Sequence, residues 1–180
     1  MSQIPTPATI DAAPEAARPI LEAVKKQIGT VPNMFRLLSN SPAALEGYVG
    51  LNGALAKGKL NPATRERIAL AIAQVNGCDY CLAAHSYIGK NLAKLDAAEI
   101  DANRHGTSTD AKADAAVRFA VALVKARGRV APQEIEQVRA AGYGDAEIVE
   151  ILAHTALNTL TNYVNEALGT EIDFPKVGAL

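Results

Sequence analysis

The stretch from residue 61 to residue 85 constrains the fold of this 180-residue chain more than any other part. Asn61 followed by Pro62 is typical of a helix start, in which an N-cap residue precedes a proline at the first helical position. The helix that we expect over residues 62–75 is apolar on most sides, so it should lie at the centre of the protein. An Asn-Gly pair ends it, and a second helix is expected over residues 79–95.

The remainder of the chain also has the pattern of helices. Alanine is the strongest helix former and is abundant here, while aromatic residues make up 4% of the chain. Further helices are expected over residues 14–28, 31–38, 42–57, 96–104, 111–126, 132–141 and 145–168. We therefore predict one all-α domain over residues 1–180 with about eight helices, in which residues 1–10 form an extended arm and residues 61–95 a redox helix pair.

The charge pattern argues against several classes of partner. The net charge is −1 and no long basic or acidic run occurs, which indicates neither a nucleic acid nor an anionic membrane as a partner. No apolar stretch approaches the roughly 18 residues that span a bilayer. The first residues lack the pattern of a secretory signal, so we expect a reducing, cytoplasmic environment. In such an environment a Cys-x-x-Cys pair is more often catalytic or metal-binding than a structural disulfide.

The two cysteines of the chain form such a pair with a base close by. Cys78, Cys81 and His85 are spaced i, i+3 and i+7, which in a helix places them within an arc of roughly 60°. Glu66 lies near the start of the preceding helix. If the two helices pack side by side, its carboxylate reaches His85 or the thiols and completes a proton relay.

This arrangement suits redox chemistry at sulfur. The thiolate is the reactive form of cysteine, and a helix N-terminus favours an anion, although the neighbouring Asp79 opposes this effect. One thiolate can attack a peroxide oxygen and become a sulfenic acid, which then condenses with the second thiol and releases water. An external dithiol restores the pair by exchange.

The same residues resemble a known family. Glu66, an eleven-residue gap, Cys78-x-x-Cys81 and then His85 resemble the motif of the alkylhydroperoxidase D-like proteins in the carboxymuconolactone decarboxylase superfamily. The flanking segments Arg-Glu-Arg-Ile-Ala-Leu-Ala and Gln-Val-Asn-Gly-Cys-Asp-Tyr-Cys-Leu-Ala-Ala-His are similar to its peroxidase-related branch. One departure is Tyr80, which stands where the best-known members have a histidine.

The resemblance implies an all-α homo-oligomer that reduces a small hydroperoxide without a bound cofactor or metal. In that family the second cysteine, here Cys81, attacks the peroxide. The first, here Cys78, resolves the sulfenic acid and meets the reductant, which is an external dithiol or a protein thiol. Glu66 and His85 would carry protons, and Tyr80 is a secondary candidate because it replaces the usual histidine.

A second polar cluster lies in the last expected helix. Its members form a stripe at i, i+4, i+7, i+8 and i+11, namely His154, Asn158, Thr161, Asn162 and Asn165. Buried amides need hydrogen-bond partners, so the simplest interpretation is a structural network or a subunit interface. The functional interpretation is that His154 or Asn158 lines a pocket beside the cysteines.

Two other functional classes remain open from the sequence. Cys78, Cys81, His85 and Glu66 have the right chemistry for four zinc ligands, so a non-catalytic zinc-binding or redox-clasp protein is one alternative. The other is a decarboxylase-type enzyme of the same superfamily that uses the polar stripe of the last helix.

Overall fold

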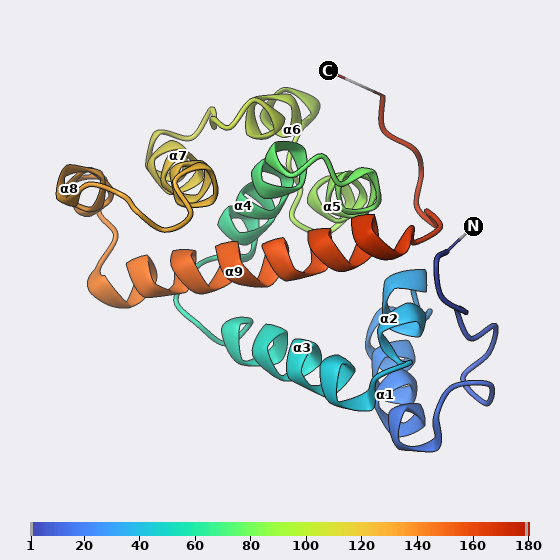
Figure 1. The fold of residues 1–180 in the computed structure, drawn as a ribbon. Coiled ribbons are helices and arrows are strands. Elements are labelled where there is room, and N and C mark those ends of the chain that lie inside the picture. Colours follow the sequence, from blue (N-terminus) through green and yellow to red (C-terminus); the bar gives the residue numbers. More distant parts are fainter. Residues whose placement is uncertain (1, 179) are drawn as a thin grey trace.

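The computed structural model describes residues 2–178 and 180, and within them all of the regular secondary structure is helical (Figure 1). A 3-10 turn at Glu15–Ala17 precedes the α-helices. These are α1 (Arg18–Ile28), α2 (Asn33–Leu38), α3 (Pro42–Leu55), α4 (Pro62–Val75), α5 (Asp79–Asn91), α6 (Ala97–Arg104), α7 (Ala111–Lys125), α8 (Pro132–Ala140) and α9 (Asp145–Leu168). The all-α prediction is confirmed, with nine α-helices in the described residues where about eight were expected.

Helix α4 lies at the centre of the fold, as its sequence predicts. It packs against α5, α6, α7 and α9, and Figure 1 shows it enclosed among them. Its side chains Ile68, Leu70 and Ile72 are completely buried. A helix surrounded in this way cannot present a polar face, which explains why apolar residues occupy most sides of α4. The groups at its two ends are thereby held against several neighbouring helices.

The long helix α9 crosses the whole molecule and links two apolar clusters (Figure 1). One cluster joins α1, α2 and α3 to the cysteine-bearing helix α5 and includes Leu21, Phe35 and Leu45. The other joins α4, α7, α8 and α9 and includes Phe119 and Ile151. Both cysteines belong to the first cluster, so the candidate site lies where the N-terminal helices cover α5.

Helix boundaries follow the expected capping signals in the central part of the chain. The side chains of Ser41 and Asn61 accept hydrogen bonds from backbone N–H groups three residues later, which confirms both predicted N-caps. Helix α5, however, ends at Asn91, so the expected boundary at residue 95 is wrong. The chain turns back there, with Lys94 at φ 59°, because Leu95 packs beside Gly89, where an added Cβ would lie 3.3 Å from the leucine side chain.

Helix α6 is held to α4 by a buried carboxylate that the sequence did not single out. Glu99 accepts hydrogen bonds from Arg67 Nε at 2.6 Å, Ser108 Oγ at 2.5 Å, Asn103 Nδ2 at 2.8 Å and the backbone N–H and hydroxyl of Thr109. Burial alone would raise the pKa of Glu99, but these donors lower it to about 2. This ionised network is structural and lies outside the pocket described below.

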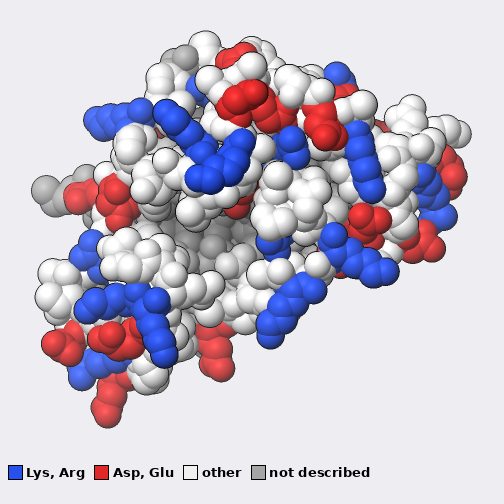
Figure 2. All heavy atoms as spheres, turned by 180° about the vertical axis from the view of Figure 1, so that it is seen from behind, with Lys and Arg blue, Asp and Glu red and all other residues white. Residues whose placement is uncertain are grey.

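The molecular surface carries both signs of charge. On the face shown in Figure 2, Lys and Arg alternate with Asp and Glu, and uncharged surface separates them. None of the described helices combines the length and the hydropathy that a membrane span requires.

The central position of α4 leads to a stability prediction. Replacing Ile72 with alanine leaves a cavity among four helices, so we expect the free energy of unfolding to fall by about 2–5 kcal/mol in urea titrations. Leu92 is 72% exposed, and Leu92→Ala is the matched control, with an expected change within about 0.5 kcal/mol. Equal effects of the two substitutions would contradict the central burial of α4.

Candidate active site

Cys78 is the N-cap residue of α5, so the cysteine pair stands at the start of that helix. The backbone turns at Gly77, which has a φ of 68° that favours glycine. The Sγ of Cys78 then accepts a hydrogen bond from the backbone N–H of Cys81 at 3.3 Å. Both cysteines are free thiols, with 0% and 2% of their surface exposed. The pair is thus close, reduced and shielded from solvent.

The surroundings of the two sulfurs shift the pKa values of the two thiols in opposite directions. A hydrogen bond from the Cys78 thiol lowers the pKa of Cys81 to about 6, and burial opposes this effect while the positive charge of His85 and the Asn165 amide add to it. Asn165 Nδ2 donates to Cys81 Sγ at 3.2 Å. The same Cys81 contact, together with burial, raises the pKa of Cys78. At neutral pH Cys81 is therefore the thiolate and Cys78 the thiol.

Glu66 and His85 are in direct contact across α4 and α5. His85 Nδ1 lies 2.8 Å from Glu66 Oε2, as the sequence predicted for two neighbouring helices. Burial by itself lowers the pKa of His85, but the charge and the hydrogen bond of Glu66 outweigh it and raise that pKa above its usual value. Glu66 thus stabilises the charged form of the imidazole, whose positive charge in turn favours the thiolate of Cys81.

A pocket of about 190 Å³ opens next to this pair. It is lined by residues from α3, α4, α5 and α9, namely Tyr48, Asn52, Ala56, Pro62, Arg65, Glu66, Ala69, His85, His154, Leu157, Asn158 and Thr161. The functional interpretation of the polar stripe was that His154 or Asn158 lines a pocket beside the cysteines, and both residues line this pocket. The cysteines themselves are not among the lining residues, and His85, one turn after Cys81, lies on the pocket wall.

Tyr48 and Arg65 are pocket residues that the sequence analysis missed. Tyr48 comes from α3, and its pKa is raised by burial and by the negative charges of Cys81 and Glu66, which places its hydroxyl close to both. Its ring packs 5.6 Å from that of Phe35. No spacing within the motif connects α3 with the cysteines, so only the tertiary packing of α3, chiefly on α9, brings Tyr48 into the site.

The polar stripe of α9 serves both of the roles considered for it. Asn76 Nδ2 donates to Asn162 Oδ1 at 2.8 Å, and Asn165 bonds Cys81, so these amides fix α9 against the end of α4 and the start of α5. Asn158 Nδ2 donates to the backbone carbonyl of His154 at 2.8 Å. The stripe is thus a structural network at one end and a pocket wall at the other.

Tyr80 points away from the pocket. Its hydroxyl donates to Asp173 Oδ1 at 2.9 Å and accepts from the backbone N–H of Met34 at 3.2 Å. Its ring also meets Phe174 edge-on, with centroids 5.8 Å apart. In this position Tyr80 joins the C-terminal tail to α2, and it does not line the cavity.

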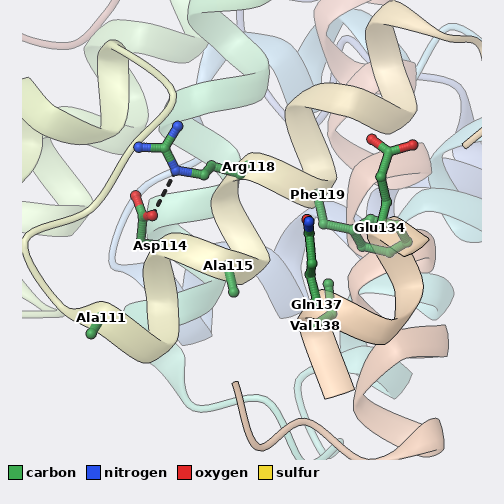
Figure 3. A pocket seen from close by; sticks show the side chains of 8 residues that line it. All are labelled: Ala111, Asp114, Ala115, Arg118, Phe119, Glu134, Gln137 and Val138. Carbon is green, nitrogen blue, oxygen red and sulfur yellow. Dashed lines mark hydrogen bonds and ion pairs between the residues drawn. The ribbon is translucent and has the colours of Figure 1, made fainter. Parts of the chain in front are cut away.

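A second hollow, between α7 and α8, lacks comparable chemistry (Figure 3). Its charged groups are engaged with one another or with backbone, since Arg118 donates to Asp114 at 2.6 Å and Glu134 accepts from the N–H of Ala131 at 2.7 Å. For the zinc alternative, no group of three or more His, Cys, Asp or Glu side chains in the described part of the chain is arranged to hold a metal ion.

Comparisons with known proteins agree with the fold and the motif. The carboxymuconolactone decarboxylase family model matches residues 42–126, whereas no curated protein sequence matches the chain. A peroxidase-related protein of Ralstonia eutropha JMP134 with an alkylhydroperoxidase AhpD core is 27% identical, at a TM-score of 0.85, over 96% of this chain and 92% of that one. A peroxidase-related protein of Silicibacter sp. TM1040 is 23% identical, at a TM-score of 0.82, over 94% and 91%.

The debrominase Bmp8, as a cysteine-to-alanine variant in complex with 2,3,4-tribromopyrrole, shares the fold at 21% identity and a TM-score of 0.80, over 96% of this chain and 94% of that one. The fold therefore carries more than one chemistry, while the family model covers the helices that hold the cysteines and Glu66. The family-model match and the fold shared with the alkylhydroperoxidase-core protein therefore support the superfamily that the motif resembles.

Proposed function

We propose that the protein is a thiol-dependent oxidoreductase that reduces small organic hydroperoxides through Cys81 and Cys78. The observation that carries this proposal is the geometry of the motif: Cys78 Sγ accepts from the backbone N–H of Cys81, Asn165 donates to Cys81 Sγ, and Glu66 is hydrogen-bonded to His85 one turn after Cys81. Cys81 is the nucleophile, Cys78 the resolving thiol, and Glu66 with His85 the proton relay.

In the first step the Cys81 thiolate attacks the terminal oxygen of the hydroperoxide. The O–O bond breaks, the sulfur is oxidised to a sulfenic acid and the substrate leaves as an alkoxide. The imidazolium of His85, on the wall of the pocket, donates the proton that converts the alkoxide into an alcohol. Glu66 stabilises the charged imidazole before the transfer and orients its ring.

In the second step the Cys78 thiol condenses with the sulfenic acid. An S–S bond forms, and the sulfenic oxygen leaves as water with the Cys78 proton and one further proton. An external dithiol, which is a small molecule or a protein, then reduces the disulfide by two exchange steps and is itself oxidised. Such a donor is available in a reducing compartment, so we place the reaction in the cytoplasm.

We also propose that a second copy of the chain covers part of α9. Several large apolar side chains of this helix are exposed, namely Val149, Leu152, Leu160 and Tyr163. Leu152, Leu160 and Tyr163 line a groove shared with the end of α7, and the pocket of the candidate active site lies elsewhere on α9. Apolar surface of this kind is costly to leave in water, and self-association would bury it.

Exchange of the nucleophile tests the proposed reaction. We expect Cys81→Ser to lower the steady-state rate with an organic hydroperoxide and a dithiol more than about 1000-fold, because the serine hydroxyl is not ionised at neutral pH. In the wild type, one equivalent of hydroperoxide should remove both free thiols. In Cys78→Ser it should leave a sulfenic acid on Cys81, which dimedone labelling and mass spectrometry detect. Turnover that persists without either cysteine would instead support a decarboxylase-type enzyme.

The proton relay gives a second prediction, on the ionisation of Cys81. The thiolate absorbance near 240 nm should titrate with a midpoint near pH 6 in the wild type. Glu66→Gln removes the carboxylate that keeps His85 charged, and a neutral imidazole no longer favours the thiolate, so the midpoint should rise. Glu46→Gln removes the same charge from an exposed position of α3 and should leave the midpoint unchanged. An unchanged midpoint in Glu66→Gln would refute the relay.

Charged substitutions on the exposed face of α9 test the proposed self-association. The wild type should sediment as a homo-oligomer at micromolar concentration, and the double substitution of Leu160 and Tyr163 by glutamate should shift it toward the monomer. Leu92→Glu, on an exposed turn after α5, is the matched control and should leave the oligomer intact. A wild type that sediments as a monomer would rule out this partner.

A further inference from the structure

The pocket beside the cysteines is polar at both ends, and its far end has no role in the proposed reaction. At the near end, Tyr48 and His85 stand next to the sulfurs. At the far end are Arg65, in the first turn of α4, and His154 on α9. The order of residues along α4 and α9 places Glu66 and Asn158 between the two ends. We refer to Arg65 and His154 as the distal pair.

Arg65 is a cation without a carboxylate partner in the described part of the chain. Its Nη1 donates to the backbone carbonyl of Leu55 at 3.3 Å, which ties it to the end of α3. The adjacent Glu66 is engaged with His85. The guanidinium therefore retains donors that can face the pocket, and a planar guanidinium is well suited to bind a carboxylate with two hydrogen bonds.

His154 independently indicates a missing acceptor. Its side chain is 95% buried, since 5% of its surface is exposed, and its Nε2 has no hydrogen-bond partner. Burial, together with the charge of Arg65, lowers its pKa to about 4, so the ring is neutral at physiological pH and still carries one N–H donor. The nearby Glu150 is already bound by the backbone N–H groups of Lys59 and Leu60. A buried ring nitrogen without a partner is uncommon unless a ligand supplies one.

We propose that the distal pair binds the carboxylate of a small organic acid, so that the substrate of this enzyme is a hydroperoxide that carries a carboxylate at its other end. Arg65 holds the carboxylate, His154 donates a further hydrogen bond to it, and the apolar side chains of Ala69 and Leu157 contact the carbon chain between the two ends. The pocket volume of about 190 Å³ restricts the ligand to a short chain.

The assignment of the substrate as a hydroperoxide rests on the proposed function, but the binding of an acid does not. Binding is therefore measured first, with unreactive ligands. Hexanoate and hexanamide are nearly the same shape and differ in charge. We expect calorimetry to give wild-type protein a dissociation constant at least about tenfold lower for hexanoate than for hexanamide, because a charge-assisted hydrogen bond replaces a neutral one. Hexanoate should also shift the ring resonances of His154.

Arg65→Gln should remove the preference for hexanoate and leave the affinity for hexanamide within about twofold, while Arg65→Lys should retain part of the preference. Lys59→Gln removes one positive charge from the surface beside the start of α4 and should leave both affinities unchanged. Equal affinities of the wild type for the two ligands would overturn the proposal, as would a loss of preference in Lys59→Gln that matches the loss in Arg65→Gln. The comparison within the wild type decides the question even if an Arg65 variant does not fold.

Steady-state rates then separate the two proposals. A short hydroperoxide with a terminal carboxylate should exceed its amide at least about tenfold in kcat/KM, and Arg65→Gln should abolish that ratio. Absence of turnover with both compounds, together with selective hexanoate binding, would refute the peroxidase and support the acid site. Equal turnover of both compounds would support the peroxidase and refute the acid site.

Discussion

The hydrogen bond between Glu66 and His85 is the contact on which the rest of the site depends. It joins α4, the most enclosed helix of the fold, to α5, the helix that begins at the cysteines. Because α4 is fixed by four neighbouring helices, the position of Glu66 is fixed with it, and His85 is oriented in turn. A charged imidazole would be less favourable in this partly buried position without the carboxylate, so the pairing also favours the charged form of His85 near Cys81.

Helix α9 contributes the second constraint, since it places amides in a position where apolar side chains would pack more simply. Asn162 and Asn165 are buried, and each has a partner near the cysteine pair, Asn162 at Asn76 after the end of α4 and Asn165 at Cys81 in α5. An amide N–H that donates to a thiolate stabilises the anion. Unlike a basic side chain, the amide does not take up a proton itself. The stabilisation of the thiolate therefore offsets the cost of burying these polar groups. The same helix forms the wall of the pocket about one turn closer to its N-terminus.

Local sequence signals were sufficient for the helices and for the contact of Glu66 with His85. Ser41 and Asn61 are N-cap residues, which marked the starts of their helices in the sequence. The spacing of Glu66, Cys78 and His85 brings Glu66 to His85 if two successive helices pack side by side. The same signals could not place Tyr48, because α3 meets the site through a tertiary contact that no spacing encodes. The turn before Leu95 was not predicted for a similar reason, because it depends on how closely the Leu95 side chain packs on Gly89.

Tyr80 lies inside the motif, but its contacts are structural. The residue between the cysteines projects toward α2 and the C-terminal tail, where Met34 and Asp173 satisfy the tyrosine hydroxyl. A hydroxyl that is satisfied there is not available to move protons at Cys81, so the relay that we propose consists of Glu66 and His85 alone. Of the residues in the motif, Glu66 and His85 line the pocket, whereas both thiols are buried and do not.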